Sequence, residues 1–489
     1  MRLLIIGLDC AAPELLFGDD RLVHIRALME AGTFGKLESI VPPITVPAWM
    51  CLATGRDPGS LGVYGFRDRV DHSYEKLSVV NSRSISEWTI WDQIAREGKK
   101  SVIIGVPPNF PPRKVNGISV GCFLTPDTTR DVYTHPAEIG AEIARLVDTY
   151  PVDVKGFRTN DKARLLEDIY AMSRKHFEVA RHFLQRGDWD YFHFVEIGLD
   201  RLQHGFWRYH DPEHVLHEPD SPYKNAIRDY YVYLDNEIAT LLESLSEDTT
   251  ILVASDHGAR RLDGGFCVNE WLIREGLLAL HTYPERITPF AQLAVDWDHT
   301  TVWSEGGYYA RVFLNVKGRE PRGTIAADDY ERVRDDIVAR LEATTGPDGA
   351  ALGTLVFKPE EIYQTVRGVA PDLLVHFGAL SWRSIGGVGY PTIHVRENDT
   401  GPDDCNHAQH GAFLLAGPNV PCQGAVEGAH ILDMAPTLLE LGGYDVPSSM
   451  TDRAGLTAFA AAPVGAGVGY SEEGEALVRE RLSGLGYIG

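Results

Sequence analysis

Short apolar runs alternate with amphipathic stretches along much of the chain. The runs LLIIGLD, SVIIGV, YFHFVEIG, TTILVAS, DLLVHF and GAFLLAGP are each typical of a buried strand that ends in a loop. Between them, residues 137–146 and 163–184 have the apolar spacing of helices. This alternation predicts an α/β fold whose mostly parallel sheet is sandwiched by helices, with ligand sites at the carboxyl ends of the strands.

The alternation is interrupted between residues 260 and 400. This stretch is rich in Gly, Trp and Tyr, has mixed strand signals such as YYARVFLNV, and contains the helical run DDYERVRDDIVARLEATTG. We therefore predict a discontinuous α/β core of residues 1–259 and 401–460, with residues 260–400 inserted as a cap region. Residues 461–489 are predicted to form a small-residue linker and a short C-terminal helix.

Composition narrows the class of protein. A chain of 489 residues with 44% hydrophobic residues can bury a large core. Its formal net charge of −23 disfavours a nucleic-acid partner or an anionic membrane surface. No apolar run is long enough to span a membrane, and the first residues lack the apolar region of a secretory signal. Six scattered cysteines fit a reducing compartment, so we expect a cytoplasmic protein.

Two of the predicted strands end in acidic residues. Asp9 ends the first strand, where it could cap the next helix or face a cation. Asp256, His257 and Gly258 directly follow the strand TTILVAS. Two adjacent ligand-type residues at the carboxyl end of a buried strand favour a metal-binding or catalytic role.

Two further pairs carry the same chemistry. Asp200 and His204 are spaced i,i+4, so on a helix they share one face and could bind a divalent metal, although solvated pairs with this spacing are common. His407 and His410 precede the strand GAFLLAGP, and either could be a ligand or an ordinary loop histidine.

A candidate nucleophile lies among prolines. Pro42, Pro43 and Pro47 bracket Thr45 in a segment that opens a helix. Thr45 could be an ordinary N-cap residue, or it could lie at a helix N-terminus that favours an anion. The combined set of Asp, His and Thr contains no Cys, which points to a dication bound by oxygen and nitrogen: zinc, manganese or iron.

Together, these residues resemble the alkaline phosphatase superfamily, and most closely its type I phosphodiesterase/nucleotide pyrophosphatase-like phosphohydrolases. The resemblance spans nearly the whole chain. Besides the five motifs, it includes TGRDPGSLGVYGF after the candidate nucleophile, VPP at 106–108, APDLLV at 370–375 and DMAPTLLELGGYDVP near the end. It implies an alkaline-phosphatase-like core and a metal-dependent phosphohydrolase, most readily a phosphodiesterase that also accepts monoesters.

The resemblance also implies two divalent metal ions, zinc first and manganese or iron as alternatives. One ion would be held by Asp9, Asp256, His257 and the Thr45 oxygen, and the other by Asp200, His204 and one of His407 and His410. Thr45 would attack the ester and form a phosphothreonine intermediate. The expected binding partner is a small phosphate-ester substrate, and a homo-oligomer is a further possibility.

One position departs from the family. Nucleotide pyrophosphatases carry a phosphate-binding Asn shortly after the nucleophile, and this chain has Phe66 at the matching place. Another group, such as Arg67 or a backbone N–H, would then hold the phosphoryl oxygen. Aromatic residues of the insertion could wall the substrate pocket or pack the insertion's own core: Trp271, Trp297, Trp303, Tyr308 and Tyr309.

Other functions remain open from the sequence. A phosphomutase, or a phosphonate- or sulfate-ester hydrolase, could use the same scaffold, although Thr45 cannot supply the formylglycine of sulfatases. A binding protein that has lost activity would retain the fold and the ligands. A dinucleotide-binding oxidoreductase is disfavoured, because LLIIGLDCAAP lacks the pattern GxGxxG.

Overall fold

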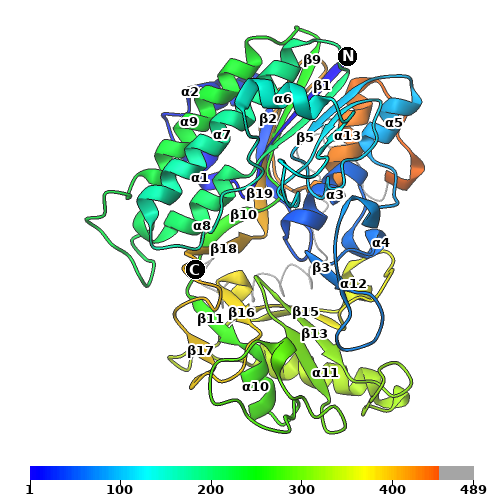
Figure 1. Cartoon of the computed structure of the whole chain (residues 1–489), viewed down its shortest axis with the longest axis vertical. Helices are drawn as coiled ribbons and strands as arrows, with labels where there is room; N and C mark the ends of the chain where they lie inside the picture. Colours follow the sequence, from blue (N-terminus) through cyan, green and yellow to red (C-terminus); the bar gives the residue numbers. More distant parts are fainter. Residues whose placement is uncertain (451–489) are drawn as a thin grey trace. The chain divides into compact units, whose positions relative to one another are not determined.

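The computed structural model describes residues 1–450, which fall into two compact units (Figure 1). The first unit contains Met1–Gly265, Pro359–Pro371 and, within the described part of the chain, the residues from Val395 onward. The second contains Phe266–Lys358 and Asp372–His394. The predicted linker and C-terminal helix at 461–489 lie outside the described residues.

A ten-stranded sheet forms the centre of the first unit. Its strands are β1 (Arg2–Leu8), β2 (Thr33–Glu38), β5 (Ser101–Ile104), β6 (Gly117–Val120), β7 (Thr134–His135), β8 (Tyr191–Glu196), β9 (Thr249–Ala254), β19 (His410–Ala416), β20 (Gly424–Ala425) and β21 (Ala429–His430). They are ordered β20-β2-β19-β9-β1-β8-β5-β6-β7, and β21 also pairs with β2. The strands from β9 to β6 are all parallel, so the predicted mostly parallel sheet is confirmed.

Helices cover both faces of this sheet (Figure 1). One face is covered by α1 (Pro13–Gly18), α2 (Val23–Ala31), α6 (Ile139–Val147), α7 (Lys162–Gln185), α8 (Gly198–His210) and α9 (Ala226–Leu242). The other face is covered by α3 (Thr45–Thr54), α4 (Pro58–Leu61), α5 (Ile90–Arg96) and α13 (Met434–Gly442).

The apolar run of β1 explains this double burial. Side chains alternate along a strand, so Leu4 and Ile6 enter the core beneath α7 to α9, while Leu3 and Ile5 enter the core beneath α3 and α13. A strand with helices on both faces is therefore apolar throughout rather than alternating, which is why these runs could be recognised in the sequence.

β19 runs against the direction of its neighbours. It pairs antiparallel with both β2 and β9. Its amino-terminal end therefore lies at the carboxyl end of β9, and the residues that precede β19 reach that edge of the sheet.

Shorter elements complete the first unit. Two antiparallel pairs form: β3 (Arg67–Arg69) with β4 (Leu77–Val79), which follows it in the chain, and β10 (Gly258–Arg261) with the distant β18 (Cys405–Ala408). Helix α12 (Pro359–Ile362) begins the segment Pro359–Pro371, which we placed in the insertion and which groups instead with the first unit. The reason is its polar contacts: Gln364 N–H donates to Asp57 Oδ2 at 2.9 Å, and Tyr64 Oη donates to the Arg367 carbonyl at 2.6 Å.

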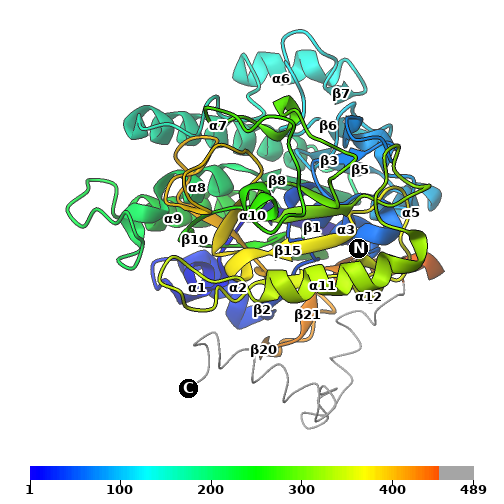
Figure 2. The same cartoon turned by 90° about the horizontal axis from the view of Figure 1, so that it is seen from below.

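The second unit has its own sheet. Strands β12 (Val302–Glu305), β13 (Ala310–Leu314), β15 (Leu373–His376) and β14 (Leu355–Phe357) pair antiparallel in that order. Helix α11 (Tyr330–Glu342) packs on this sheet at β14 (Figure 2). The run DLLVHF is thus a strand, as predicted, but it belongs to this antiparallel sheet, because an apolar run does not show which strand it will pair with.

A third, smaller sheet and several short helices remain. The sheet is β16 (Trp382–Ile385), β11 (Gly264–Cys267) and β17 (His394–Val395), and α10 (Val268–Arg274) follows β11. The 3-10 helices are η1 (Ser82–Ser84), η2 (Phe290–Gln292), η3 (Ala327–Asp329), η4 (Phe377–Leu380), η5 (Ile431–Asp433) and η6 (Ser448–Met450).

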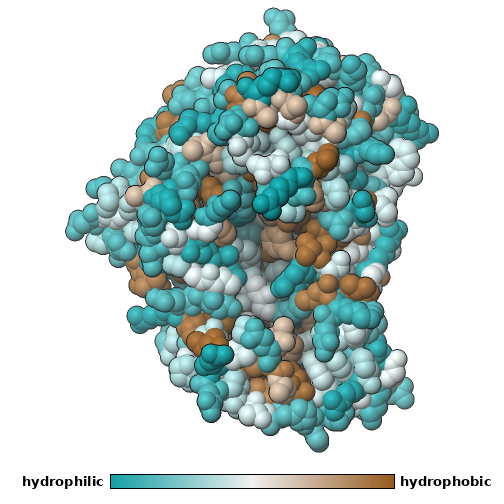
Figure 3. Space-filling view, in the orientation of Figure 1, coloured by the Kyte–Doolittle hydropathy of each residue, from teal (hydrophilic) through white to brown (hydrophobic). Residues whose placement is uncertain are grey.

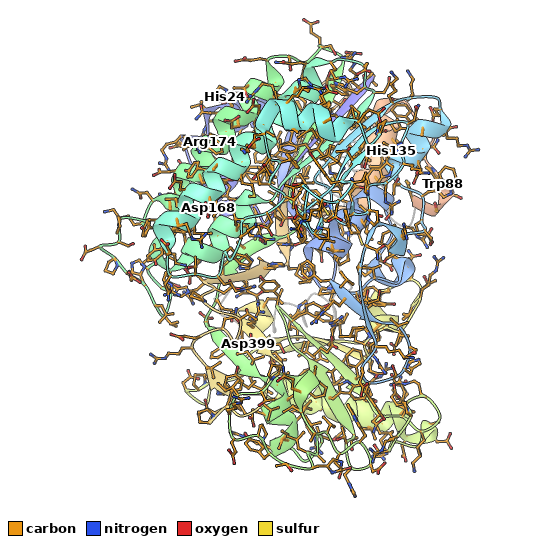
Figure 4. All side chains as sticks on the ribbon, viewed as in Figure 1. His24, Trp88, His135, Asp168, Arg174 and Asp399 are labelled. Atoms are coloured by element: carbon orange, nitrogen blue, oxygen red, sulfur yellow. The ribbon has the colours of Figure 1, made fainter. Side chains whose placement is uncertain are left out.

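The surface matches the charge of the sequence. Most of the face in Figure 3 is hydrophilic. Figure 4 shows His24 on α2 and Asp168 and Arg174 on α7, the helices of one outer layer, where Arg174 is exposed and His24 and Asp168 are partly buried. Among residues 1–450, no helix is both long enough and apolar enough to cross a membrane.

Candidate metal centre

Asp9 and Asp256 meet because their strands are in register. β1 and β9 are parallel neighbours that pair Gly7 with Ala254, and each aspartate lies two residues beyond its strand's paired residue. Both side chains are fully buried. His257 Nε2 lies 3.2 Å from Asp256 Oδ2 and 3.8 Å from Asp9 Oδ1. The structure therefore brings together the acidic ends of two strands that are 247 residues apart in number (256 minus 9).

Thr45 lies at the same edge of the sheet. It is the first residue of α3, so the N–H groups of that helix's first turn have no partners within the helix. Its Oγ1 lies 3.2 Å from His257 Nε2, and its side chain is buried. The predicted placement of Thr45 at a helix N-terminus is confirmed.

Asp200 and His204 lie one turn apart on α8, as predicted from their spacing. His204 Nε2 is 3.3 Å from Asp200 Oδ1, and both side chains are buried. Arg201 pairs with Asp200 Oδ2 and also contacts both carboxylate oxygens of Asp153, at 2.8 and 2.9 Å. One carboxylate oxygen of Asp200 is therefore neutralised by Arg201, and the other faces His204.

The structure separates the two late histidines. His407 lies in β18, is buried, and its Nε2 is 3.9 Å from Asp200 Oδ1. Its ring stacks on that of His257 with centroids 3.7 Å apart. His410 is exposed at the start of β19, where it pairs with Glu38. Of the two, His407 is the one that lies among the other candidate ligands.

Supporting residues that the sequence did not reveal hold this cluster in place. Trp49 Nε1 donates to Asp9 Oδ2 at 2.8 Å. His204 Nδ1 lies 2.6 Å from Asp403 Oδ1, and Arg158 Nε donates to Asp403 Oδ2 at 3.0 Å. An outer partner of this kind orients a ligating imidazole and fixes its tautomer. Tryptophans and loop aspartates are too common for a sequence to signal these roles.

Burial and mutual repulsion control the charges in the cluster. Burial, followed by the charge of Asp200, holds the pKa of Asp9 well above its usual range, and burial followed by the charge of Asp9 does the same for the pKa of Asp256. Burial opposes ionisation of Asp200 too, but His204 and Arg201 outweigh it and hold its pKa well below the usual range.

The imidazoles of the cluster favour their neutral form. Burial lowers the pKa of His257 to about 4, and burial together with the nearby His257 lowers the pKa of His407 well below its usual range. Neutral imidazole is the form that binds metal ions, so both rings are ready to act as ligands.

The residues present fit divalent cations. Asp9 Oδ1, Asp200 Oδ1 and Asp256 Oδ2 are buried, and within residues 1–450 none of them accepts a hydrogen bond. Buried carboxylate oxygens without donors are costly unless a cation neutralises them. Three groups have ligand atoms within 4.8 Å of one another: Asp9, Asp256 and His257; Asp200, His257 and His407; and Cys10, Asp200 and His204. The last group contains a thiol, whereas our prediction from the sequence was a set without Cys.

The structure gives other contacts to the remaining candidates. The Phe66 ring packs edge-on against Phe123 at 6.2 Å, and Arg67 is exposed in β3. The aromatic residues of the second unit mainly pack with one another: Trp297 on Trp303 at 5.1 Å, and Trp303 on Phe313 at 5.5 Å. This favours the interpretation of Trp303 as part of the unit's own core.

Comparison with known sequences identifies the family. The sequence model of the type I phosphodiesterase/nucleotide pyrophosphatase family matches residues 3–412. The chain belongs to this family. The resemblance stated from the motifs is thereby confirmed, and the chain is placed among hydrolases that act on phosphoric ester bonds. No curated protein sequence matches the chain.

Solved structures confirm the fold. Murine ectonucleotide pyrophosphatase/phosphodiesterase 5 superposes with a TM-score of 0.52 at 15% identity, over 91% of this chain and 96% of that chain. Phosphonoacetate hydrolase from Sinorhizobium meliloti 1021, solved with phosphonoformate, superposes with a TM-score of 0.58 at 15% identity, over 90% and 96%. At these identities the similarity establishes the alkaline-phosphatase-like α/β fold.

Proposed function

We propose that the protein is a metal-dependent phosphodiesterase that acts on a small phosphate ester through Thr45. The observation that carries the proposal is the convergence of the Thr45 hydroxyl with buried His rings and with buried Asp carboxylates, each of which has an oxygen that accepts no hydrogen bond within residues 1–450. Asp9, Asp256, His257 and Thr45 would hold one divalent ion, and Asp200, His204 and His407 a second. Zinc suits this donor set best.

When bound, two such ions would lower the pKa of the Thr45 hydroxyl and neutralise charge on the attacking and leaving oxygens. Thr45 itself attacks phosphorus. Its Oγ1 releases its proton to solvent and forms an ester bond to phosphorus, while the bond from phosphorus to the leaving oxygen breaks and the leaving oxygen takes a proton from water. Water then hydrolyses the phosphothreonine and restores the hydroxyl.

The surroundings of Thr45 suit an anionic substrate. The first N–H groups of α3 favour negative charge next to the nucleophile. They also offer a backbone alternative to the Asn that Phe66 replaces. An inactive threonine-to-alanine variant of the murine relative was solved in complex with AMP, which supports a nucleotide-sized phosphate ester as the first substrate to assay here.

The test combines metal analysis with a substrate panel. Purified protein is analysed for bound metal and assayed with an aryl phosphodiester, an aryl phosphomonoester and a phosphonate. The Thr45→Ala variant should lose about 10³-fold or more of the diesterase rate, while Thr129→Ala, an exposed threonine, should retain it. Unchanged turnover in Thr45→Ala would exclude Thr45 as the nucleophile. Preference for the phosphonate would indicate a phosphonate hydrolase instead. Transfer of the phosphoryl group to an acceptor other than water would indicate a phosphomutase.

A further inference from the structure

Cys10 has a backbone conformation that is unusual for its side chain. It follows Asp9 directly, and its φ is +67°, in the left-handed region that favours glycine. The side chain is fully buried. A residue with a Cβ has a less favourable backbone than glycine in this region.

The thiol faces candidate metal ligands. Ligand atoms of Cys10, Asp200 and His204 all lie within 4.8 Å of one another. In a tetrahedral zinc site with sulfur and nitrogen ligands, ligand atoms are roughly 3.3–3.8 Å apart, since Zn–S is about 2.3 Å and Zn–N about 2.0 Å. Small side-chain rotations would therefore bring all three atoms to one ion.

The ligand atoms of Cys10 and Asp200 make few short hydrogen bonds within the described residues. Asp200 Oδ1 is buried and, within the described residues, accepts no hydrogen bond. The Cys10 thiol donates a long hydrogen bond, 3.5 Å, to the Gly258 carbonyl, and it also lies within hydrogen-bonding reach of a second buried thiol, Cys405. An inert structural cysteine is usually surrounded by apolar atoms, whereas this one lies beside a carboxylate and an imidazole.

We propose that Cys10 is a sulfur ligand of the divalent ion held by Asp200 and His204. This rests on the proposed two-metal function and deepens it. The thiol releases its proton to solvent as the metal–sulfur bond forms, so no oxidant or reductant is needed. A thiolate in the set would make this ion site prefer zinc or cobalt over magnesium or manganese, and would add a sulfur atom to the oxygen and nitrogen ligands predicted from the sequence.

Cobalt titration of the metal-free full-length protein tests the proposal directly. Co²⁺ bound to a thiolate produces a sulfur-to-cobalt charge-transfer band in the near ultraviolet, whereas oxygen and nitrogen ligands alone do not. We expect the band in the natural protein and in Cys122→Ser, which removes a buried thiol elsewhere. We expect no band in Cys10→Gly, and roughly tenfold or more weaker binding of one cobalt equivalent.

Cys10→Gly also controls for folding, because glycine suits φ +67° better than cysteine does. Its metal-free form should unfold at the same or a higher temperature than the natural protein, so loss of the band cannot be attributed to misfolding. If the natural protein binds cobalt without showing the band, the proposed sulfur ligand is overturned while the two-metal function still stands. Failure to bind two equivalents of cobalt would overturn the proposed two-metal site itself.

Discussion

His204 Nδ1 lies 2.6 Å from Asp403 Oδ1, and neither side chain is exposed to solvent. Arg158 in turn holds the second oxygen of Asp403 at 3.0 Å. With Nδ1 engaged, the Nε2 atom of His204 points to Asp200, 3.3 Å away. The loop before β18 therefore determines which nitrogen of His204 is offered to the site.

Asp403→Asn should weaken this orientation without removing a proposed ligand. We expect the affinity for divalent metal to fall about 10- to 100-fold, as for other outer-shell partners of ligating histidines. Affinity is measured by competition with a chromophoric chelator. Glu397→Gln, an exposed carboxyl in the preceding loop, serves as the control. Equal affinity in Asp403→Asn and the natural protein would mean that Asp403 does not position His204.

Asp256→Asn should stabilise the metal-free protein while reducing its metal content. Burial and the charge of Asp9 raise the pKa of Asp256 above its unfolded value, so ionisation of Asp256 destabilises the folded state at neutral pH. We expect an increase of roughly 1–2 kcal/mol in the free energy of unfolding in the presence of a chelator, measured with urea. The gain should grow as pH rises above the ordinary Asp range, and the exposed Asp220→Asn should show none.

His193 should contribute to acid unfolding. Burial lowers its pKa to about 3, so between its ordinary pKa and pH 3 the unfolded chain binds a proton that the folded protein does not. Its contribution to stability is therefore lost as pH falls through this window, at up to about 1.4 kcal/mol per pH unit.

Tyr191 Oη lies 3.0 Å from His193 Nδ1, so replacing His193 alone would leave a buried hydroxyl without its partner. The effect of His193 is therefore measured in a Tyr191→Phe background. We compare Tyr191→Phe with Tyr191→Phe/His193→Phe, both metal-free, in urea at several pH values. The double variant should show a flatter decline of stability toward low pH. Parallel declines in the two variants would contradict the assignment.

Trp303→Ala should destabilise the second unit. The ring is 2% exposed and packs against Trp297 and Phe313. Removing a buried tryptophan of this kind costs about 3–5 kcal/mol. Urea unfolding followed by circular dichroism should show the loss, and the half-exposed Trp88→Ala should not. A change in KM with unchanged stability would instead support a role in the substrate pocket.

The sequence was most informative where a single strand or helix was enough to place a candidate site residue. The apolar runs of β1 and β9 predicted buried parallel strands, and the polar residues that follow such strands had to meet at one edge. The spacing of Asp200 and His204 similarly needed only a helix. The start of α3 at Thr45 was predictable from the flanking prolines.

Other features depended on contacts between distant segments. His407 and His410 look equivalent in sequence, because nothing in CNHAQHG shows that β18 pairs with β10 before β19 begins. Asp403 and Cys10 have no local signal for their roles. The direction of β19 and the sheet that receives β15 are likewise set by tertiary packing, which a single apolar run does not encode.

The reversed direction of β19 brings His407 to the edge where Asp9 ends β1, so the cluster joins segments that lie far apart in the sequence. During synthesis Asp9 leaves the ribosome almost 400 residues before His407 does. The nascent polypeptide therefore cannot bring Asp9 and His407 together until β18 has been synthesised. A product truncated before β18 would retain most of the parallel strands and still lack His407.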